Sequence, residues 1–204
     1  MSMLPEIATL IAFIAACLAL NFTPGADMMF TIASAAHGGA KAGVAAAVGI
    51  NLGVVVHIRR AAVGLAALIA AEPLAYDAIR YLGAGYLIWL AWQMWRAPAV
   101  SVGEAEDAPL SATVKRGFIT NVLNPKTALF IFAFLPQFAD SERGQVSVQI
   151  IALGAIFICT GLTVNASVGA LAGVAATRIR RASRAMNRLS AIVFAGLAAR
   201  LVLD

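Results

Sequence analysis

The sequence predicts an all-α integral membrane protein with six transmembrane helices in two inverted three-helix repeats, the first and fourth helices being broken. Three observations support this: the composition, the spacing of apolar stretches, and two proline-containing stretches at corresponding positions. Of the 204 residues, 61% are hydrophobic and 12% are charged, and the mean hydropathy is +0.87. An average soluble domain carries about 25% charged residues. The chain is therefore expected to form a single transmembrane domain over 1–204.

Six stretches have the length and apolar character of a membrane-spanning helix. About 20 apolar residues cross the roughly 30 Å hydrocarbon layer of a bilayer. The first, second and fifth stretches exceed that length, so we expect them to tilt, break or protrude. The expected spans are 5–34, 42–70, 74–95, 116–138, 146–175 and 186–203.

Lysine and arginine are distributed unevenly between the expected connections. The first, third and fifth connections carry nine of them: Lys41, Arg96, Lys115, Arg116, Arg178, Arg180, Arg181, Arg184 and Arg188. The opposite side carries three: Arg80, Arg143 and Arg200. The positive-inside rule then places the basic side in the cytoplasm and both termini outside it. The polar, acidic connection at 97–114 separates two pseudo-repeats, 1–96 and 115–204.

The net charge of +5 and the pI of about 9.8 would suit nucleic-acid binding. Membrane topology accounts for this charge, because most basic residues lie between apolar runs. We therefore expect membrane lipid as a partner and exclude nucleic acid.

The first and fourth expected spans each contain a proline. The first includes NFTPGADMMF at 21–30 with Pro24, and the fourth includes NVLNPKTALF at 121–130 with Pro125. Proline removes a backbone donor and clashes with the preceding turn, so each helix is expected to break there. Non-helical backbone at membrane depth persists only where it is buried in protein or lines an aqueous cavity. Paired breaks in two halves of opposite orientation point to the central site of a transporter.

The residues at the two breaks suit a zwitterionic ligand. A helix that restarts after Pro24 and Gly25 presents free N–H groups and a positive dipole end, which attract a carboxylate. Lys126 adds a full positive charge at the second break. Asp27 is the one carboxylate expected deep within a span, where it could accept a substrate ammonium group or a coupling proton. The candidate substrate-binding residues are Asn21, Pro24, Gly25, Asp27, Asn121, Asn124, Pro125 and Lys126.

Each of these residues also has a structural interpretation. The prolines could be kinks that aid packing. Lys126 could extend to the membrane interface, and Asp27 could pair with Lys126 or with an arginine. The three asparagines could satisfy backbone carbonyls freed by the breaks.

A second charged feature is VVVHIRRAAVG at 54–64, near the middle of the second span. An arginine at the centre of a span costs about 2.5 to 3.5 kcal/mol on insertion scales. Arg59 and Arg60 are therefore expected to face a broad cavity or a partner interface. Together with Asp27 and His57 they are candidates for a proton relay or for charge partners. The alternatives are a span shifted so that the arginines approach an interface, and a packed structural role for His57.

The chain resembles the LysE/RhtB family of amino-acid exporters in an ordered set of motifs. These are LNFTPGADMMF at 20–30, HGGAKAGVAAAVGINLG at 37–53, NVLNPKTALFIFAFLPQF at 121–138, and NRLSAIVFAGLAARL near the C-terminus. The resemblance implies a secondary transporter in the bacterial plasma membrane that exports amino acids or their derivatives, driven by the proton gradient. The family usually carries apolar or small residues after the histidine, so Arg59 and Arg60 depart from its pattern. Their extra positive charge suggests an acidic or anionic substrate, or pairing with Asp27.

Three other functional classes fit the sequence less well. A divalent-cation exporter of related six-helix architecture would need clustered acidic or histidine ligands in the membrane, and Asp27 stands alone. An intramembrane protease would need a Ser/His pair or two aspartates, and neither arrangement occurs, so no enzyme activity, metal or other cofactor is expected. A purely structural scaffold would not require paired breaks and buried charges. The glycine pairs Gly49/Gly53 and Gly169/Gly173 favour close helix packing and permit a homodimer without requiring one.

Overall fold

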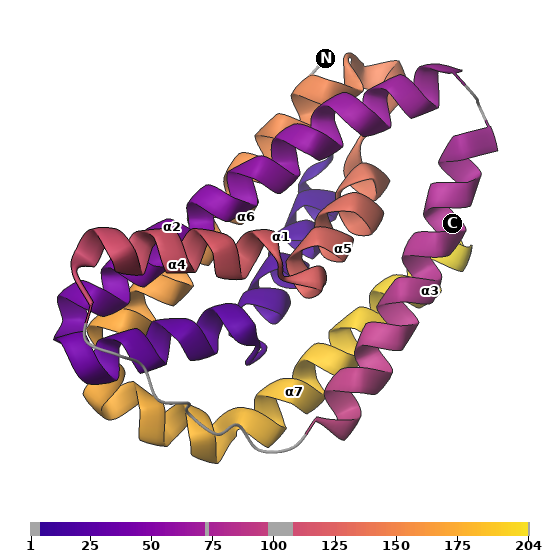
Figure 1. Cartoon of the computed structure of the whole chain (residues 1–204). Helices are drawn as coiled ribbons and strands as arrows, with labels where there is room; N and C mark the ends of the chain where they lie inside the picture. The colour runs from indigo at the N-terminus through magenta and orange to yellow at the C-terminus, as the bar shows by residue number, and fades with distance from the viewer. Residues whose placement is uncertain (1–4, 72–73, 98–107, 204) are drawn as a thin grey trace.

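A computed structural model describes residues 5–71, 74–97 and 108–203, and every regular element within these ranges is helical. Figure 1 shows the helices as one elongated assembly. The α-helices are α1 (Ile7–Phe22), α2 (Ala26–Ala71), α3 (Leu74–Arg96), α4 (Leu110–Val122), α5 (Pro125–Phe134), α6 (Val146–Ala170) and α7 (Ala172–Leu203). Two short 3₁₀ helices, η1 (Leu135–Phe138) and η2 (Ser141–Arg143), connect α5 to α6.

Two helices of the described chain are long and apolar enough to cross a membrane: α2 over Ala26–Gly64, and α6. A third span forms if α4 and the segment Pro125–Phe138 are taken together, with a bend of 54° between them. The apolar helix α1 is shorter, at 16 residues. The protein is thus a helical membrane protein, and its division into six spans stays a prediction.

Both proline breaks lie where the sequence predicts them. Helix α1 ends at Phe22 and α2 begins at Ala26, with Thr23 in an extended conformation. Helix α4 ends at Val122 and α5 begins at Pro125, the first helical position, where the missing N–H costs nothing. The Asn124 side chain caps α5 by accepting a hydrogen bond of 3.0 Å from the Lys126 backbone N–H.

A single glycine replaces the loop expected between the first two spans. Gly39 has φ 71° and ψ −171°, a conformation that residues with a Cβ rarely adopt. It divides α2 into an arm over 26–38, which begins at the first break, and a longer part over 40–71. The arm therefore turns into the next segment without an intervening loop.

Three expected boundaries were wrong. Helix α4 begins at Leu110, within the expected linker, and α6 ends at Ala170 rather than at 175. Helix α7 begins at Ala172, so the basic run expected as a loop before 186 is helical. Alanine and arginine dominate that run, and both favour helix. Most of the linker, 98–107, lies outside the described residues.

Glycines bring α2 into backbone contact with α4 and α6. A Cβ at Gly49 would meet the carbonyl of Val114 on α4, and one at Gly53 would lie 2.7 Å from the side-chain oxygen of Asn121. A Cβ at Gly43 would lie 2.6 Å from the Cα of Gly169 on α6. The predicted packing role of Gly49 and Gly53 is confirmed.

The prediction that Gly169 and Gly173 form a second packing pair on one helix was wrong, because α6 ends before Gly173. The surroundings of Gly173 lie outside the described side chains. The partner of Gly169 is instead Gly43, so this close contact joins two different helices.

Phenylalanine rings fill the core between α1 and the segment that follows the second break. The Phe134 ring centroid lies 6.3 Å from that of Phe13 and 4.7 Å from those of Phe130 and Phe138. Phe13, Phe130 and Phe134 are almost completely buried. Along one edge of the assembly, α3 and α7 lie side by side, apart from the pairing of α2 with α4 and α6 (Figure 1).

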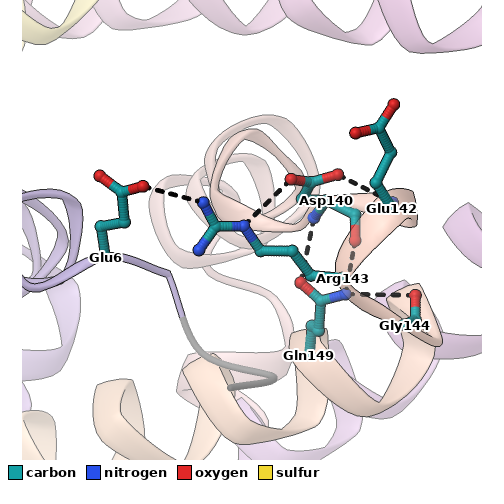
Figure 2. Close-up of polar contacts among 6 residues, drawn as sticks. All are labelled: Glu6, Asp140, Glu142, Arg143, Gly144 and Gln149. Carbon is teal, nitrogen blue, oxygen red and sulfur yellow. Dashed lines mark hydrogen bonds and ion pairs between the residues drawn. The ribbon is translucent and has the colours of Figure 1, made fainter. Parts of the chain in front are cut away.

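A polar network joins the start of α1 to the η2 turn (Figure 2). The Arg143 guanidinium reaches between the carboxylates of Glu6 and Asp140, with N–O distances of 3.2 Å to each. The hydrogen bond to Glu6 raises the pKa of Arg143 above its ordinary value, and Asp140 adds to the effect. Beneath it, the buried Gln149 amide donates to the carbonyls of Asp140 (2.7 Å) and Gly144 (3.2 Å).

We expect Gly43→Ala to destabilise the protein by about 1–3 kcal/mol, because the added methyl group overpacks the contact with Gly169. Thermal unfolding of the purified protein in detergent measures the change. Gly85→Ala is the matched control, since a Cβ there meets no atom within 4 Å. An equal loss of stability in both variants would contradict the close contact.

We expect Gln149→Ala to destabilise by about 1–3 kcal/mol, because it removes three part-buried hydrogen bonds to the backbone of Asp140 and Gly144, which flank η2. Glu6→Gln should have a much smaller effect, since the Glu6 side chain is 75% exposed and its ion pair is screened by solvent. The two unfolding midpoints are compared in the same detergent. A larger loss from Glu6→Gln than from Gln149→Ala would contradict this assignment.

Candidate functional site

The two breaks meet, and Asp27 is one point of contact. Asp27 lies in the first turn of α2, where a negative charge is favoured by the helix dipole. Its Oδ2 accepts hydrogen bonds from the Asn121 side-chain amide of α4 (2.9 Å) and from the Thr127 hydroxyl of α5 (3.2 Å). One carboxylate oxygen therefore links the first break to both sides of the second.

Lys126 links the breaks in the other direction. Its ammonium group donates to the backbone carbonyls of Leu20 (3.0 Å) and Thr23 (2.9 Å), at the end of α1. Carbonyls at a helix C-terminus lack intrahelical partners and carry partial negative charge, so a cation is favoured there. Lys126 therefore caps α1, an arrangement that differs from an extension to the membrane interface.

A small cavity of about 20 Å³ lies between these groups, with room for about one water molecule. Asp27, Lys126 and Asn165 of α6 are among its lining residues. Asp27 Oδ1 and Asn165 Oδ1 are buried without a hydrogen-bond partner. A buried acceptor that lacks a donor is costly, so this cavity suits a group that brings protons or positive charge.

A larger cavity of about 490 Å³ lies beside the small one and shares Gly25, Asn124 and Lys126 with it. The first residues of both restarted helices, Ala26 of α2 and Pro125 of α5, border this cavity. Its other wall belongs to the last turns of α3 and contains Trp89, Trp92, Gln93 and Arg96. The positive ends of two helix dipoles therefore face one space, large enough for a small organic molecule.

The two helix starts differ in how their N–H groups are occupied. In α2 the first intrahelical hydrogen bond runs from the Met29 N–H to the Gly25 carbonyl (2.9 Å). The N–H groups that precede Met29 in the first turn therefore have no acceptor within the helix. Gly25, at the cap position, has no side chain to accept from them. In α5 the Asn124 side chain already accepts from Lys126. The N-terminus of α2 is thus better able to bind an anion than the N-terminus of α5.

The remaining asparagine of the predicted set lies on the other side of the small cavity. Asn21 donates to the Thr160 hydroxyl of α6 (3.2 Å). Asn21 Oδ1 and Asn51 Oδ1 both lie next to Gly161 of α6, each 3.4 Å from the position that a Cβ there would take. Amide groups of α1 and α2 therefore meet next to Gly161 of α6.

His57, Arg59 and Arg60 separate in the structure. His57 is buried, and its Nε2 lies 3.1 Å from the Asn121 carbonyl, which can only accept, so Nε2 carries the proton. Its Nδ1 has no hydrogen-bond partner. Arg59 and Arg60 are exposed, and neither lines either of the two cavities. Of the three, the structure brings only His57 next to a residue of the candidate site.

The depth of the arginines follows from the packing of α2 on α6. Ile58 contacts Gly154, eight residues or about 12 Å along the axis from the first residue of α6. Arg59 therefore lies about two turns inside that end of the helix pair, on the same exposed face as Val55 and Val63.

Sequence reasoning missed several residues of the site: Asn51, Trp89, Trp92, Thr127 and Asn165. Asn165 could have been found from the sequence, because it is a polar amide within a long apolar run, four residues after Gly161. Trp89 and Trp92 gave another, because a cluster of tryptophans ends the third expected span. In the described part of the chain, no group of three or more His, Cys, Asp or Glu side chains is placed to hold a metal ion.

Apolar helices that meet at two proline breaks, with charged and amide side chains next to a cavity, are typical of helical membrane transporters. Residues 18–204 match the family described as LysE type translocator. The chain belongs to this family, which is a transporter family and not an enzyme family.

Curated relatives cover most of this chain. The chain is 28% identical over 190 residues to an uncharacterized membrane protein of Vibrio cholerae, covering 91% of this chain and 92% of the relative. It is 30% identical to a homoserine/homoserine lactone efflux protein of Salmonella typhimurium, covering 86% of each chain. It is 33% identical to a leucine efflux protein of Klebsiella pneumoniae, covering 87% of each chain. No solved structure matches the chain.

We expect Asn121→Leu to destabilise the protein by about 1–3 kcal/mol, because it removes a buried donor to the Asp27 carboxylate. Unfolding in detergent measures the change. Thr120→Val, at the neighbouring half-buried position, is the control and should be close to neutral. Equal stability of Asn121→Leu and the parent protein would show that this bond does not hold the breaks together.

Proposed function

We propose that this protein is a secondary transporter that exports amino acids or their derivatives across the bacterial plasma membrane, coupled to the proton gradient. The observation that carries the proposal is the meeting of the two breaks. Asp27 and Lys126 line the small cavity, and the first residues of α2 and α5 border the larger cavity, which Lys126 also lines. An α-amino acid carries both charges, so the site offers a complement to each. The efflux functions named for the Salmonella and Klebsiella relatives support the same substrate class.

The substrate carboxylate would bind at the start of α2. The N–H groups of its first turn and the positive end of its dipole border the cavity beside Lys126. In this arrangement Lys126 keeps its bonds to the end of α1 and contributes its field rather than a direct contact. Asn124 and Pro125 shape the opposite rim.

The substrate ammonium group, or a coupling proton in its place, would go to Asp27. Asp27 Oδ1 is the free acceptor of that carboxylate, and Asn165 Oδ1 is a second unpartnered acceptor lining the same small cavity. Protonation of Asp27 would weaken its charge-assisted bonds from Asn121 and Thr127, so proton binding and the contact between the breaks would be linked. His57, hydrogen-bonded to the Asn121 carbonyl, is the candidate proton partner of Asp27.

We further propose six spans in two inverted repeats, with the basic end of the molecule in the cytoplasm. The larger cavity lies at the level of Arg96, one of the residues of that basic end. The phenylalanine cluster and the Arg143 network lie on the other side of the breaks. The site would then be open to the cytoplasm and closed to the outside, the state in which an exporter takes up its substrate.

Arg59 and Arg60 stand outside this proposed route, because they line neither cavity. As exposed cations within a helix pair, they would extend toward lipid phosphate groups at the nearer interface.

We expect Asp27→Asn and Lys126→Met each to lower amino-acid efflux by at least about tenfold, since each removes a charge whose hydrogen bonds are worth more than about 1.4 kcal/mol. Efflux of a labelled amino-acid panel is measured from loaded proteoliposomes, with and without a pH gradient. The matched controls are Asp140→Asn, at the η2 turn, and Lys115→Met, exposed on α4.

Undiminished flux in both site variants would exclude the proposed roles of Asp27 and Lys126. Flux that ignores the pH gradient in the unsubstituted protein would exclude proton coupling. The same vesicles loaded with Mn²⁺ or Cd²⁺ address the alternative substrate class: export of these ions without export of any amino acid would replace the proposal by a divalent-cation exporter.

A further inference from the structure

The larger cavity has a polar side and an aromatic side. Gly25, Asn124 and Lys126 belong to the two breaks, whereas Trp89 and Trp92 belong to α3. The two tryptophans, here called the aromatic wall, remain 45% and 53% exposed. A space of about 490 Å³ exceeds the volume taken by the ammonium and carboxylate groups alone, so it has room for a substrate side chain next to this wall.

The aromatic wall is held at a fixed position relative to the breaks. The Tyr86 hydroxyl donates to the Lys126 backbone carbonyl (3.2 Å), which ties α3 to the start of α5. The Tyr86 and Trp89 ring centroids lie 5.7 Å apart, so Trp89 stands directly next to this tie. The fold thereby sets the distance between the charged groups and the aromatic wall. This distance determines how long a substrate must be to contact both.

Arg96 holds the outer end of the aromatic wall. Its guanidinium carbon lies 4.7 Å from the centroid of the Trp92 ring, within the range of a cation–π contact. This contact orients the Trp92 ring and gives the Arg96 guanidinium a partner. The guanidinium therefore stacks on the aromatic surface of the cavity wall.

We infer that Trp89 and Trp92 form the subsite for the substrate side chain, and that the exported molecules are amino acids with a large apolar or aromatic side chain rather than short polar ones. This inference rests on the proposed function. Burial of apolar surface against the two rings supplies the preference, and indole rings bind both aliphatic and aromatic groups. A serine-sized substrate would reach the charged groups and leave the aromatic wall hydrated.

Trp95 provides a matched control. It lies on the same helix, is 57% exposed, and contacts an arginine in the same manner, since the Arg188 guanidinium carbon lies 5.6 Å from its ring centroid. It does not line the cavity. A change that follows from the general loss of an exposed tryptophan on α3 would therefore appear in Trp95→Ala as well.

The test is the ratio of phenylalanine to serine efflux from proteoliposomes loaded with both labelled amino acids. We expect the unsubstituted protein to favour phenylalanine, and Trp89→Ala and Trp92→Ala to lower the ratio by about tenfold, the smaller end of what lost apolar contacts produce. Trp95→Ala should keep the ratio of the unsubstituted protein. Trp89→Phe and Trp92→Phe retain a ring and should keep most of it.

A ratio near or below one in the unsubstituted protein would overturn the inference, as would a ratio that neither alanine variant changes or that Trp95→Ala lowers equally. An equal loss of phenylalanine and serine efflux would also overturn it, because the aromatic wall would then serve structure alone. These outcomes leave amino-acid export standing. Absence of efflux for every amino acid in the unsubstituted protein would instead overturn the proposed function itself.

Discussion

Two reciprocal ties across the helix breaks hold the centre of this protein together. Lys126 of the second half caps the end of α1, and Asp27 of the first half receives donors from α4 and α5. Each break exposes backbone groups that a membrane interior cannot hydrate, and each is stabilised by a side chain from the other half. Because the ties use charged groups, neither half can move away from the other without desolvated charge losing its partner. The cavity and its helix N-termini exist because this arrangement keeps the breaks adjacent.

The rest of the architecture serves to deliver these groups to one place. Glycines on α2 let α4 and α6 approach to backbone distance, which brings Asn121 and Asn165 toward the first break. Thr23 and Ser190 add a contact between α1 and α7, their hydroxyls lying 2.6 Å apart. Polar atoms are thus concentrated near the breaks, while phenylalanine rings pack the region between the breaks and the η2 turn.

Features set by local chemistry could be predicted from the sequence, and those set by long-range packing could not. The breaks at Pro24 and Pro125 follow from a missing N–H and a ring clash, so their positions were confirmed. The groups that Lys126 contacts are backbone carbonyls more than a hundred residues away, and no residue pattern marks them. The exposure of Arg59 could not be predicted for a similar reason. The exposed face of this helix contains both valine and arginine, so which face is exposed depends on the neighbouring helices. The start of α7 was missed because charge was taken to indicate a loop, although arginine is a good helix former.

The turn at Gly39 amplifies small rotations of the arm that precedes it. The part of α2 after Gly39 is packed on α6 where Gly43 meets Gly169, so it provides a rigid support. The part before Gly39 carries Asp27 at its far tip, 12 residues or about 18 Å away. A swing of about 5° about that glycine displaces the tip by about 1.5 Å, more than a hydrogen bond tolerates. A rotation of this size about Gly39 is therefore large enough to break the hydrogen bonds of the Asp27 carboxylate.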